Sequence, residues 1–306
     1  MKPSEWMPGT VGISVHYTAS TAAENGESCS YREAVSRFDP TAFADSLAEA
    51  GAAHCIFTLT HARQYLPLPC TPLEALLPGR TAERDLIGEI IQALAQRKIR
   101  FIAYYNHSCN GGDDPEWKDA CGYSEGIRGD PDRFAQNICD IVSFIARRYG
   151  KGLSGWWFDS PYSVDHRGPH DTVSTDLGAW LFPWEKLIGA AKAGNADCAV
   201  AVNAGVGSHF QYAPRLDYCA GEAVRLDEAF GAVPAGLTDH RWITLDSPAW
   251  VYGGGTFASP RFSDDALRAF LRENRTAGRM TTFNLEIDRF GMLNPDSLRQ
   301  LRRVLP

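Results

Sequence analysis

The chain has 306 residues, which fits one large domain or two medium ones, since a single (β/α)₈ barrel needs about 250 residues. Its 44% hydrophobic and 22% charged residues are typical of a globular protein and exclude disorder for the bulk of the chain. A net charge of −7 argues against nucleic acid as the main partner, because surfaces that bind polyanions are positively charged.

The sequence carries no signal for a membrane or for secretion. It has no apolar run of about 18 residues, and Met1–Gly12 has one lysine and no apolar segment of the kind found in signal peptides. The eight cysteines include no CxxC motif and no tight pairing, which indicates reduced, buried thiols. We therefore expect a cytoplasmic protein without a membrane partner, although a secreted form trimmed of its signal would look the same, and the oligomeric state stays open.

Short apolar runs alternate with amphipathic stretches along the whole chain. Strands are expected at Gly12–Tyr17, His54–Thr60, Ile99–Tyr105, Gly155–Phe158, Ala199–Asn203, Asp217–Ala220, Trp242–Leu245 and Met280–Leu285. Helices are expected at Phe38–Ala50, Thr81–Arg97, Pro131–Tyr149, Trp184–Ala193, Asp264–Ala277 and Asp296–Val304. This alternation predicts an α/β fold with a parallel sheet.

Eight such units in about 300 residues favour a closed (β/α)₈ TIM-type barrel over an open doubly wound sheet. The open sheet would also need a glycine-rich phosphate loop after its first strand, and none is present. The last predicted helix ends the chain, so we expect residues 1–306 to form a single domain. Two long connections, Thr18–Arg37 and Asn106–Gly129, follow strands and therefore lie at the rim where barrel active sites form.

Histidines, carboxylates and aromatic residues gather at the ends of the predicted strands. They are His16, His61, Tyr105, His107, Trp157, Asp159, Asn203, Glu222, Asp246 and Trp250. In a barrel these positions converge on one mouth, where rings give apolar contact and polar groups bind hydroxyls, as a sugar site requires.

Each of these residues also has a purely structural interpretation. A lone histidine at a strand end is more often a structural hydrogen-bonding group, and Asp159 alone could cap a helix or form a turn. Strand alternation places only one of Trp156 and Trp157 inside the barrel. The functional interpretation is favoured because several strands agree.

Metal and serine-hydrolase chemistry have weaker support. His16, His61 and His107 could hold zinc together with Asp159, but no HExxH motif or paired Cys/His spacing accompanies them. A G-x-S-x-G elbow for Ser-His-Asp chemistry is also missing from the sequence. We therefore expect neither a metal nor a cofactor.

Several segments, taken in order, resemble the α-L-fucosidase family of retaining glycoside hydrolases. The matching segments are Gly12–Tyr17, Phe38–Pro40, Ala50–Ala52, Thr58–His61, Arg84–Leu86, Tyr104–Asn106, Tyr149–Gly150, Trp157–Asp159, Val202–Asn203, Phe283–Glu286 and Phe290–Leu293. Each motif is weak alone, whereas their order and spacing over nearly the whole chain are fairly specific.

The resemblance implies roles for matching residues. Asp159 would be the catalytic nucleophile, His16 and His61 would contact sugar hydroxyls, and Trp157 would line the pocket. The implied activity is retaining, exo-acting cleavage of fucose or a related sugar by a catalytic barrel that lacks the family's usual C-terminal β-sandwich.

The sequence also departs from the family at named positions. Ala62 replaces a second histidine, and Ile243 stands where one branch of the family has its acid/base glutamate. The acid must then come from elsewhere, with Glu222 as first candidate, followed by Asp246 and His240.

Two further interpretations stay open. These departures also fit a non-hydrolytic carbohydrate-binding protein built on a degenerate hydrolase barrel. A third possibility keeps catalysis but changes the substrate: the departures at Ala62, Ile243 and Ala204 fall in the expected pocket, so the sugar need not be fucose. Under each of these interpretations the expected small-molecule partner is a carbohydrate, and a barrel with other chemistry also stays open.

Overall fold

A computed structural model describes residues 2–123, 129–173, 177 and 179–305 of the chain. Eight strands form one sheet. They are β1 (Val11–Val15), β2 (His54–Thr60), β3 (Arg100–Asn106), β4 (Leu153–Asp159), β5 (Ala199–Val202), β6 (Glu222–Ala223), β7 (His240–Thr244) and β8 (Met280–Leu285).

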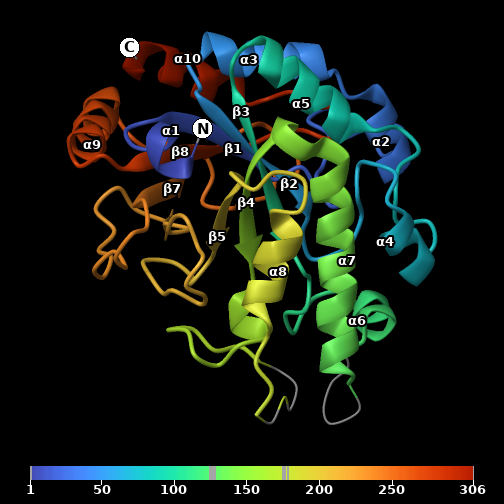
Figure 1. The fold of residues 1–306 in the computed structure, drawn as a ribbon. Coiled ribbons are helices and arrows are strands. Elements are labelled where there is room, and N and C mark those ends of the chain that lie inside the picture. Colours follow the sequence, from blue (N-terminus) through green and yellow to red (C-terminus); the bar gives the residue numbers. More distant parts are fainter. Residues whose placement is uncertain (1, 124–128, 174–176, 178, 306) are drawn as a thin grey trace.

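The strands follow the order β5-β4-β3-β2-β1-β8-β7-β6, and every pair is parallel. The first and last strands therefore pair with each other, which curls the sheet into the shape of a barrel whose two edges are β5 and β6 (Figure 1). This arrangement confirms the predicted (β/α)₈ fold class.

The segment between β5 and β7, residues 203–239, is irregular except for the very short strand β6. The amide of Asp217 donates to the Val200 carbonyl on β5 at 2.9 Å, and its own carbonyl accepts from Thr238 at 3.1 Å. The amide of Cys219 donates to the Thr238 carbonyl at 2.9 Å. These hydrogen bonds pair backbone groups at the edges of the sheet. A sixth strand of ordinary length would otherwise be needed to pair them.

The helices surround the sheet, and Figure 1 shows α3, α5, α7 and α8 outside the strands. They are α1 (Pro3–Trp6), α2 (Tyr31–Arg37), α3 (Pro40–Glu49), α4 (Thr71–Leu76), α5 (Leu86–Gln96), α6 (Pro115–Cys121), α7 (Pro131–Tyr149), α8 (Trp184–Ala191), α9 (Asp264–Thr276) and α10 (Pro295–Val304), with 3₁₀ turns η1 (Gly150–Gly152) and η2 (Pro161–Ser163). None of the helices in the described ranges is long and apolar enough to cross a bilayer.

The bounds predicted for β2, β8 and α7 agree with the structure, and the other long elements differ mainly at their ends. The helices α1, α2, α4 and α6 were not predicted, because each has seven residues or fewer and shows too little periodicity. Two of them, α2 and α6, lie inside the two long connections that follow β1 and β3. Residues 124–128 of the second connection lie outside the described residues.

The prediction of the sixth strand at Asp217–Ala220 was wrong, because the strand is Glu222–Ala223. Gly221 precedes it with a φ of +71°, and a Cβ there would lie 2.0 Å from the His240 carbonyl oxygen. The chain thus turns at a glycine that touches β7 and only then enters the sheet. Glu222 consequently lies within the strand instead of following it.

Side chains of the strands alternate between two apolar layers. The barrel interior is filled by large rings and aliphatic groups, namely Trp6, Met7, Ile56, Ile102, Tyr104, Trp157, Tyr218, Trp242 and Met280, together with small alanines. A larger cluster, including Phe57, Phe101, Trp156 and Phe158, packs between the sheet and the helices. The barrel is therefore a solid core, and a ligand can approach only at its ends.

The floor of the barrel contains a buried polar group. Thr282 Oγ1 lies 2.8 Å from Nε2 of both His54 and His240. The His54 ring fits there because residue 12 is a glycine: a Cβ at Gly12 would lie 2.2 Å from His54 Cδ2 and 2.4 Å from the His54 carbonyl oxygen. Burial lowers the pKa of His54 to about 3, so its imidazole is neutral at physiological pH.

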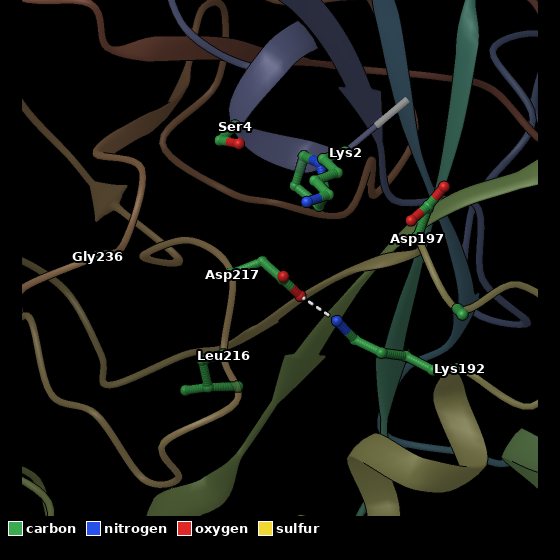
Figure 2. A pocket seen from close by; sticks show the side chains of 9 residues that line it. Lys2, Ser4, Lys192, Asp197, Leu216, Asp217 and Gly236 are labelled. Carbon is green, nitrogen blue, oxygen red and sulfur yellow. Dashed lines mark hydrogen bonds and ion pairs between the residues drawn. The ribbon is translucent and has the colours of Figure 1, made fainter.

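A hollow at the N-terminal ends of the strands is lined partly by charged groups (Figure 2). Lys192 pairs with Asp217 at 2.8 Å, and the same carboxylate oxygen accepts from the Val200 amide at 2.9 Å. This carboxylate therefore anchors the start of β5. Residues at this end of a (β/α)₈ barrel serve stability, which separates the hollow from the strand ends considered below.

Gly12→Ala should destabilise the protein by about 3 kcal/mol, because the added methyl group would force β1 and β2 apart at His54. Gly111→Ala is the matched control, since a Cβ at that exposed glycine meets nothing within 4 Å and should change stability by less than about 0.5 kcal/mol. Urea unfolding of both variants measures the difference. Equal stability of the two variants would contradict the close packing of Gly12 on His54.

Stability should fall as the pH drops below the ordinary histidine value of 6.5. The unfolded chain binds a proton at His54 there, whereas the folded protein binds it only near its pKa of about 3. The unfolded state then holds more protons, so the free energy of unfolding rises with pH by about 1.4 kcal/mol per unit for this group between these values. Urea unfolding from pH 4.5 to 6 should show a smaller slope for His54→Asn than for wild type. An unchanged slope would mean that His54 is charged in the fold.

Candidate active site

Asp159, the last residue of β4, is held by donors on both carboxylate oxygens. Oδ1 accepts from the Ser160 amide at 2.7 Å and from Asn203 Nδ2 at 2.9 Å. Oδ2 accepts from the Tyr104 hydroxyl at 2.5 Å and from Asn106 Nδ2 at 3.2 Å. The side chain is half-buried, and these bonds fix its orientation before any ligand binds.

Glu222 on β6 supplies a second carboxylate beside Asp159. Its Oε2 lies 2.6 Å from the same Asn203 nitrogen that lies 2.9 Å from Asp159 Oδ1. These two oxygens cannot be farther apart than the sum of the two distances. Burial, followed by the negative charge of Asp159, raises the pKa of Glu222 to about 7. Near neutral pH this group can thus both give and take a proton.

Two histidines from neighbouring strands lie close to this pair of carboxylates. The rings of His16, which follows β1, and His61, which follows β2, are 5.5 Å apart, and both contact Tyr104. Burial, with a smaller contribution from His61, lowers the pKa of His16 to about 3. Burial also lowers the pKa of His61. Both rings are therefore neutral hydrogen-bonding groups at physiological pH.

The tautomer of His16 follows from its neighbour Asn284. Asn284 Nδ2 donates to the Trp250 carbonyl at 3.2 Å, so its Oδ1 faces His16 Nδ1 at 2.9 Å and must accept. The proton of His16 then lies on Nδ1, and Nε2 is an acceptor suited to a hydroxyl group. Trp250 packs 5.4 Å from the same imidazole and belongs to the same cluster.

Trp157 lies below this cluster, inside the barrel. Its ring stacks on Tyr104 at 5.2 Å, and its indole N–H donates to the Ala220 carbonyl at 3.0 Å. Only 1% of its surface is exposed. The structure therefore places Trp157 as a support beneath Tyr104, which in turn binds Asp159.

The structure does not bring Tyr105 and His107 to the cluster. The Tyr105 hydroxyl donates to Gln64 at 3.1 Å, and its ring packs against Phe158 in the layer facing the helices. His107 Nε2 bonds the Ser160 carbonyl at 2.7 Å. Its ring packs on Phe134 of α7. The prediction that Tyr105 and His107 contact the substrate needs correction, because the alternation of side chains that begins in β3 turns both of them toward the helices.

The other two candidates for the acid, Asp246 and His240, are bonded to other groups. Asp246 is buried, where it accepts from the Glu286 amide at 2.9 Å and the Ser297 hydroxyl at 3.0 Å, which connects the ends of β7 and β8 to α10. The structure thus gives Asp246 a structural role. His240 belongs to the barrel floor. Ile243 packs in the layer between sheet and helices, so a carboxylate at this position of β7 would point away from the barrel mouth.

Tyr104, Asn106 and Asn284 are site residues that were not predicted as such. Tyr104 pairs in register with Trp157, and Asn106 pairs with Asp159. Counting back two residues along β4 from Asp159 to Trp157 identifies the inward face, and the neighbouring strand then presents Tyr104 and Asn106 on that face. This period-two signal was present in the sequence.

Unusual backbone conformations follow three of these strands. Ala62, Ser108 and Ser160 have positive φ angles of 54°, 57° and 65°, each within two residues of the end of β2, β3 or β4. Non-glycine residues in this region store strain that the surrounding structure must support, and such residues cluster at functional sites. Ala62 is the position where the family resemblance leads one to expect a second histidine.

The described part of the chain holds no group of three His, Cys, Asp or Glu side chains arranged to bind a cation. Of the four residues weighed as zinc ligands, His107 is turned away from the others and bonded to the Ser160 carbonyl.

Solved structures similar to this chain include glycoside hydrolases of two kinds. The endo-fucoidan hydrolase MfFcnA4 from glycoside hydrolase family 107 matches with a TM-score of 0.73 and 15% identity over 98% of this chain and 53% of that one. The endo-fucoidan hydrolase P5AFcnA matches with a TM-score of 0.70 and 14% identity over 98% and 91%. Alpha-L-fucosidase AlfC from Lactobacillus casei, in complex with alpha-L-fucose product, matches with a TM-score of 0.68 and 15% identity over 98% and 96%.

These identities establish a shared fold, and the chain spans about half the length of MfFcnA4. No curated protein matches it closely enough to count as a relative. The alpha-L-fucosidase family model, however, matches residues 2–202. Because this match extends over more than half of the 306 residues, the chain belongs to the alpha-L-fucosidase family of glycoside hydrolases.

Proposed function

We propose that this chain is a retaining, exo-acting glycosidase that releases α-L-fucose or a related sugar. Asp159 is the nucleophile, and Glu222 is the acid and base. The observation that carries the proposal is the placement of two carboxylates on one shared donor, Asn203 Nδ2. The family and the solved structures of fucose-releasing and fucoidan-cleaving enzymes support the choice of sugar.

The carboxylate separation favours retention over inversion. Retaining enzymes place their two carboxyl groups about 5–5.5 Å apart, whereas inverting enzymes need about 6.5–9.5 Å to admit a water molecule. The nearest oxygens of Asp159 and Glu222 are no farther apart than the summed distances of 2.9 and 2.6 Å to Asn203 Nδ2. This leaves no space between those two oxygens for the inverting arrangement.

The reaction then has two steps. Asp159 attacks the anomeric carbon while Glu222 gives its proton to the leaving oxygen, so the glycosidic bond breaks and a glycosyl ester of Asp159 forms. Glu222 next takes a proton from water, whose oxygen attacks the same carbon and frees Asp159. A pKa of about 7 suits Glu222 to both steps, because a proton donor and acceptor works best near the operating pH.

Neutral imidazoles and rings complete the sugar site. His16 Nε2 accepts from a sugar hydroxyl, and His61 lies close enough to bind a neighbouring one. Trp250, packed 5.4 Å from His16, offers an apolar surface to the sugar.

A second candidate is a carbohydrate-binding protein without hydrolytic activity. It is favoured by Ala62, which stands where the family resemblance leads one to expect a second histidine. Tight sugar binding without product formation would support it, and the assays below separate the two functions.

Wild-type protein should release phenol from aryl α-L-fucosides or a related member of an aryl glycoside panel, and Asp159→Ala should lower kcat/KM by about 10⁴-fold because the nucleophile is lost. Asp217→Asn is the control, since this carboxylate lies at the opposite end of the barrel and bonds Lys192. Activity of Asp159→Ala close to that of wild type would contradict the assignment of Asp159 as the nucleophile. If wild type hydrolyses no glycoside of the panel but binds sugar in calorimetry, the result would support the carbohydrate-binding protein instead.

Activity of wild type should decline above about pH 7, since deprotonated Glu222 cannot protonate the leaving oxygen in the first step. Glu222→Gln should lose this decline. It should also lose more activity on a glycoside with a poor leaving group, such as an alkyl glycoside, than on a dinitrophenyl glycoside, which departs without protonation. The ratio of kcat/KM for the two substrates measures the effect. Equal losses on both substrates would remove Glu222 from the acid role.

A further inference from the structure

Asn203 is the residue at which the two carboxylates meet. It follows β5, and its backbone amide donates to the Phe158 carbonyl at 2.8 Å. Its side-chain Oδ1 accepts from the Gly205 amide at 3.0 Å. With only 1% of its surface exposed, the side chain is fixed on both the backbone and the oxygen side.

These contacts settle which end of the amide faces the carboxylates. Oδ1 is occupied by the Gly205 amide, so Nδ2 points at Asp159 and Glu222, and its two hydrogens serve one oxygen each. The reversed amide would place a carbonyl oxygen against two carboxylates, with no donor between them.

We propose that Asn203 is a positioning residue: its amide nitrogen holds Asp159 and Glu222 at a fixed separation and stabilises the carboxylate form of Glu222. This inference rests on the proposed function, in which that carboxylate is the base of the second step. Asn203 itself takes and gives no proton.

The bond also determines where the acidic proton of Glu222 lies. Because Oε2 accepts from Asn203, the proton of neutral Glu222 occupies Oε1, the oxygen without this partner. Asn203 therefore leaves a single oxygen of Glu222 to protonate the leaving group. The same bond lets Oε2 carry negative charge after that proton has gone.

Among the described groups, two titratable side chains influence Glu222 most directly. Asp159 on β4 opposes its ionisation, and Tyr162, just beyond β4, also interacts electrostatically with it. On the β7 side its register partner is Trp242, which does not titrate. Asn203 is the side chain that bonds the carboxylate and favours its charged form.

Asn203→Ala should lower kcat by about 10–100-fold, because the two carboxylates lose their common anchor. It should also move the basic limb of the pH–rate profile upward by about one pH unit, since a hydrogen bond to a charged group is lost. The matched control is Asn106→Ala. Asn106 Nδ2 bonds Asp159 Oδ2 at 3.2 Å but is not bonded to Glu222, so its loss should lower kcat without moving that limb.

Carboxyl ¹³C NMR titration of Glu222, assigned with Glu222→Gln, gives a readout independent of turnover. Asn203→Ala should raise the pKa of Glu222 by about one unit relative to wild type and to Asn106→Ala. An unmoved pKa in folded Asn203→Ala overturns the positioning role, even if wild type proves to be a fucosidase. If wild type hydrolyses no glycoside, the proposed function fails, while the titration still decides whether Asn203 stabilises the Glu222 carboxylate.

Discussion

Side chains alternate between the two faces of a strand, and in a barrel this alternation decides which residues reach the mouth. Along β4 it turns Trp157 and Asp159 inward and Phe158 outward. The register then matches Tyr104 to Trp157 and Asn106 to Asp159. The stacked rings of Tyr104 and Trp157 and the hydrogen bond between Asn106 and Asp159 thus form together, because the neighbouring strands β3 and β4 build both.

The sequence predicted the strand ends well but not which face each residue takes. Asp159, Glu222 and Asn203 were all predicted, and the structure joins them through one nitrogen atom. Tyr105 and His107 were predicted beside them, yet they face the helices, because adjacent residues at a strand end lie on opposite sides of the sheet. The sixth strand was misplaced because two residues carry no periodicity, and only the three-dimensional contact of Gly221 with β7 determines where it starts.

The strained backbone beyond β3 and β4 explains how the side chains of Asn106 and Asp159 are oriented. Ser160, at a φ of 65°, turns its own amide back toward Asp159 Oδ1. Ser108, at a φ of 57°, likewise directs its amide to Asn106 Oδ1 at 2.7 Å, which orients the Asn106 nitrogen toward Asp159. Both conformations cost energy, so they persist because the sheet below is rigid.

The donors that hold Asp159 are all neutral in the described structure: two tyrosine hydroxyls, two side-chain amides and a backbone N–H. Neutral donors orient a carboxylate without cancelling its charge, whereas a lysine or arginine would pair with it. Glycoside cleavage builds positive charge on the sugar ring, and an unpaired negative charge beside the ring stabilises it. A protonated imidazole beside the sugar would repel the positive charge that develops on the sugar ring. The burial that keeps the pKa of His16 near 3 therefore serves the proposed chemistry, because it leaves the sugar site with hydrogen-bonding groups and no competing cation at His16.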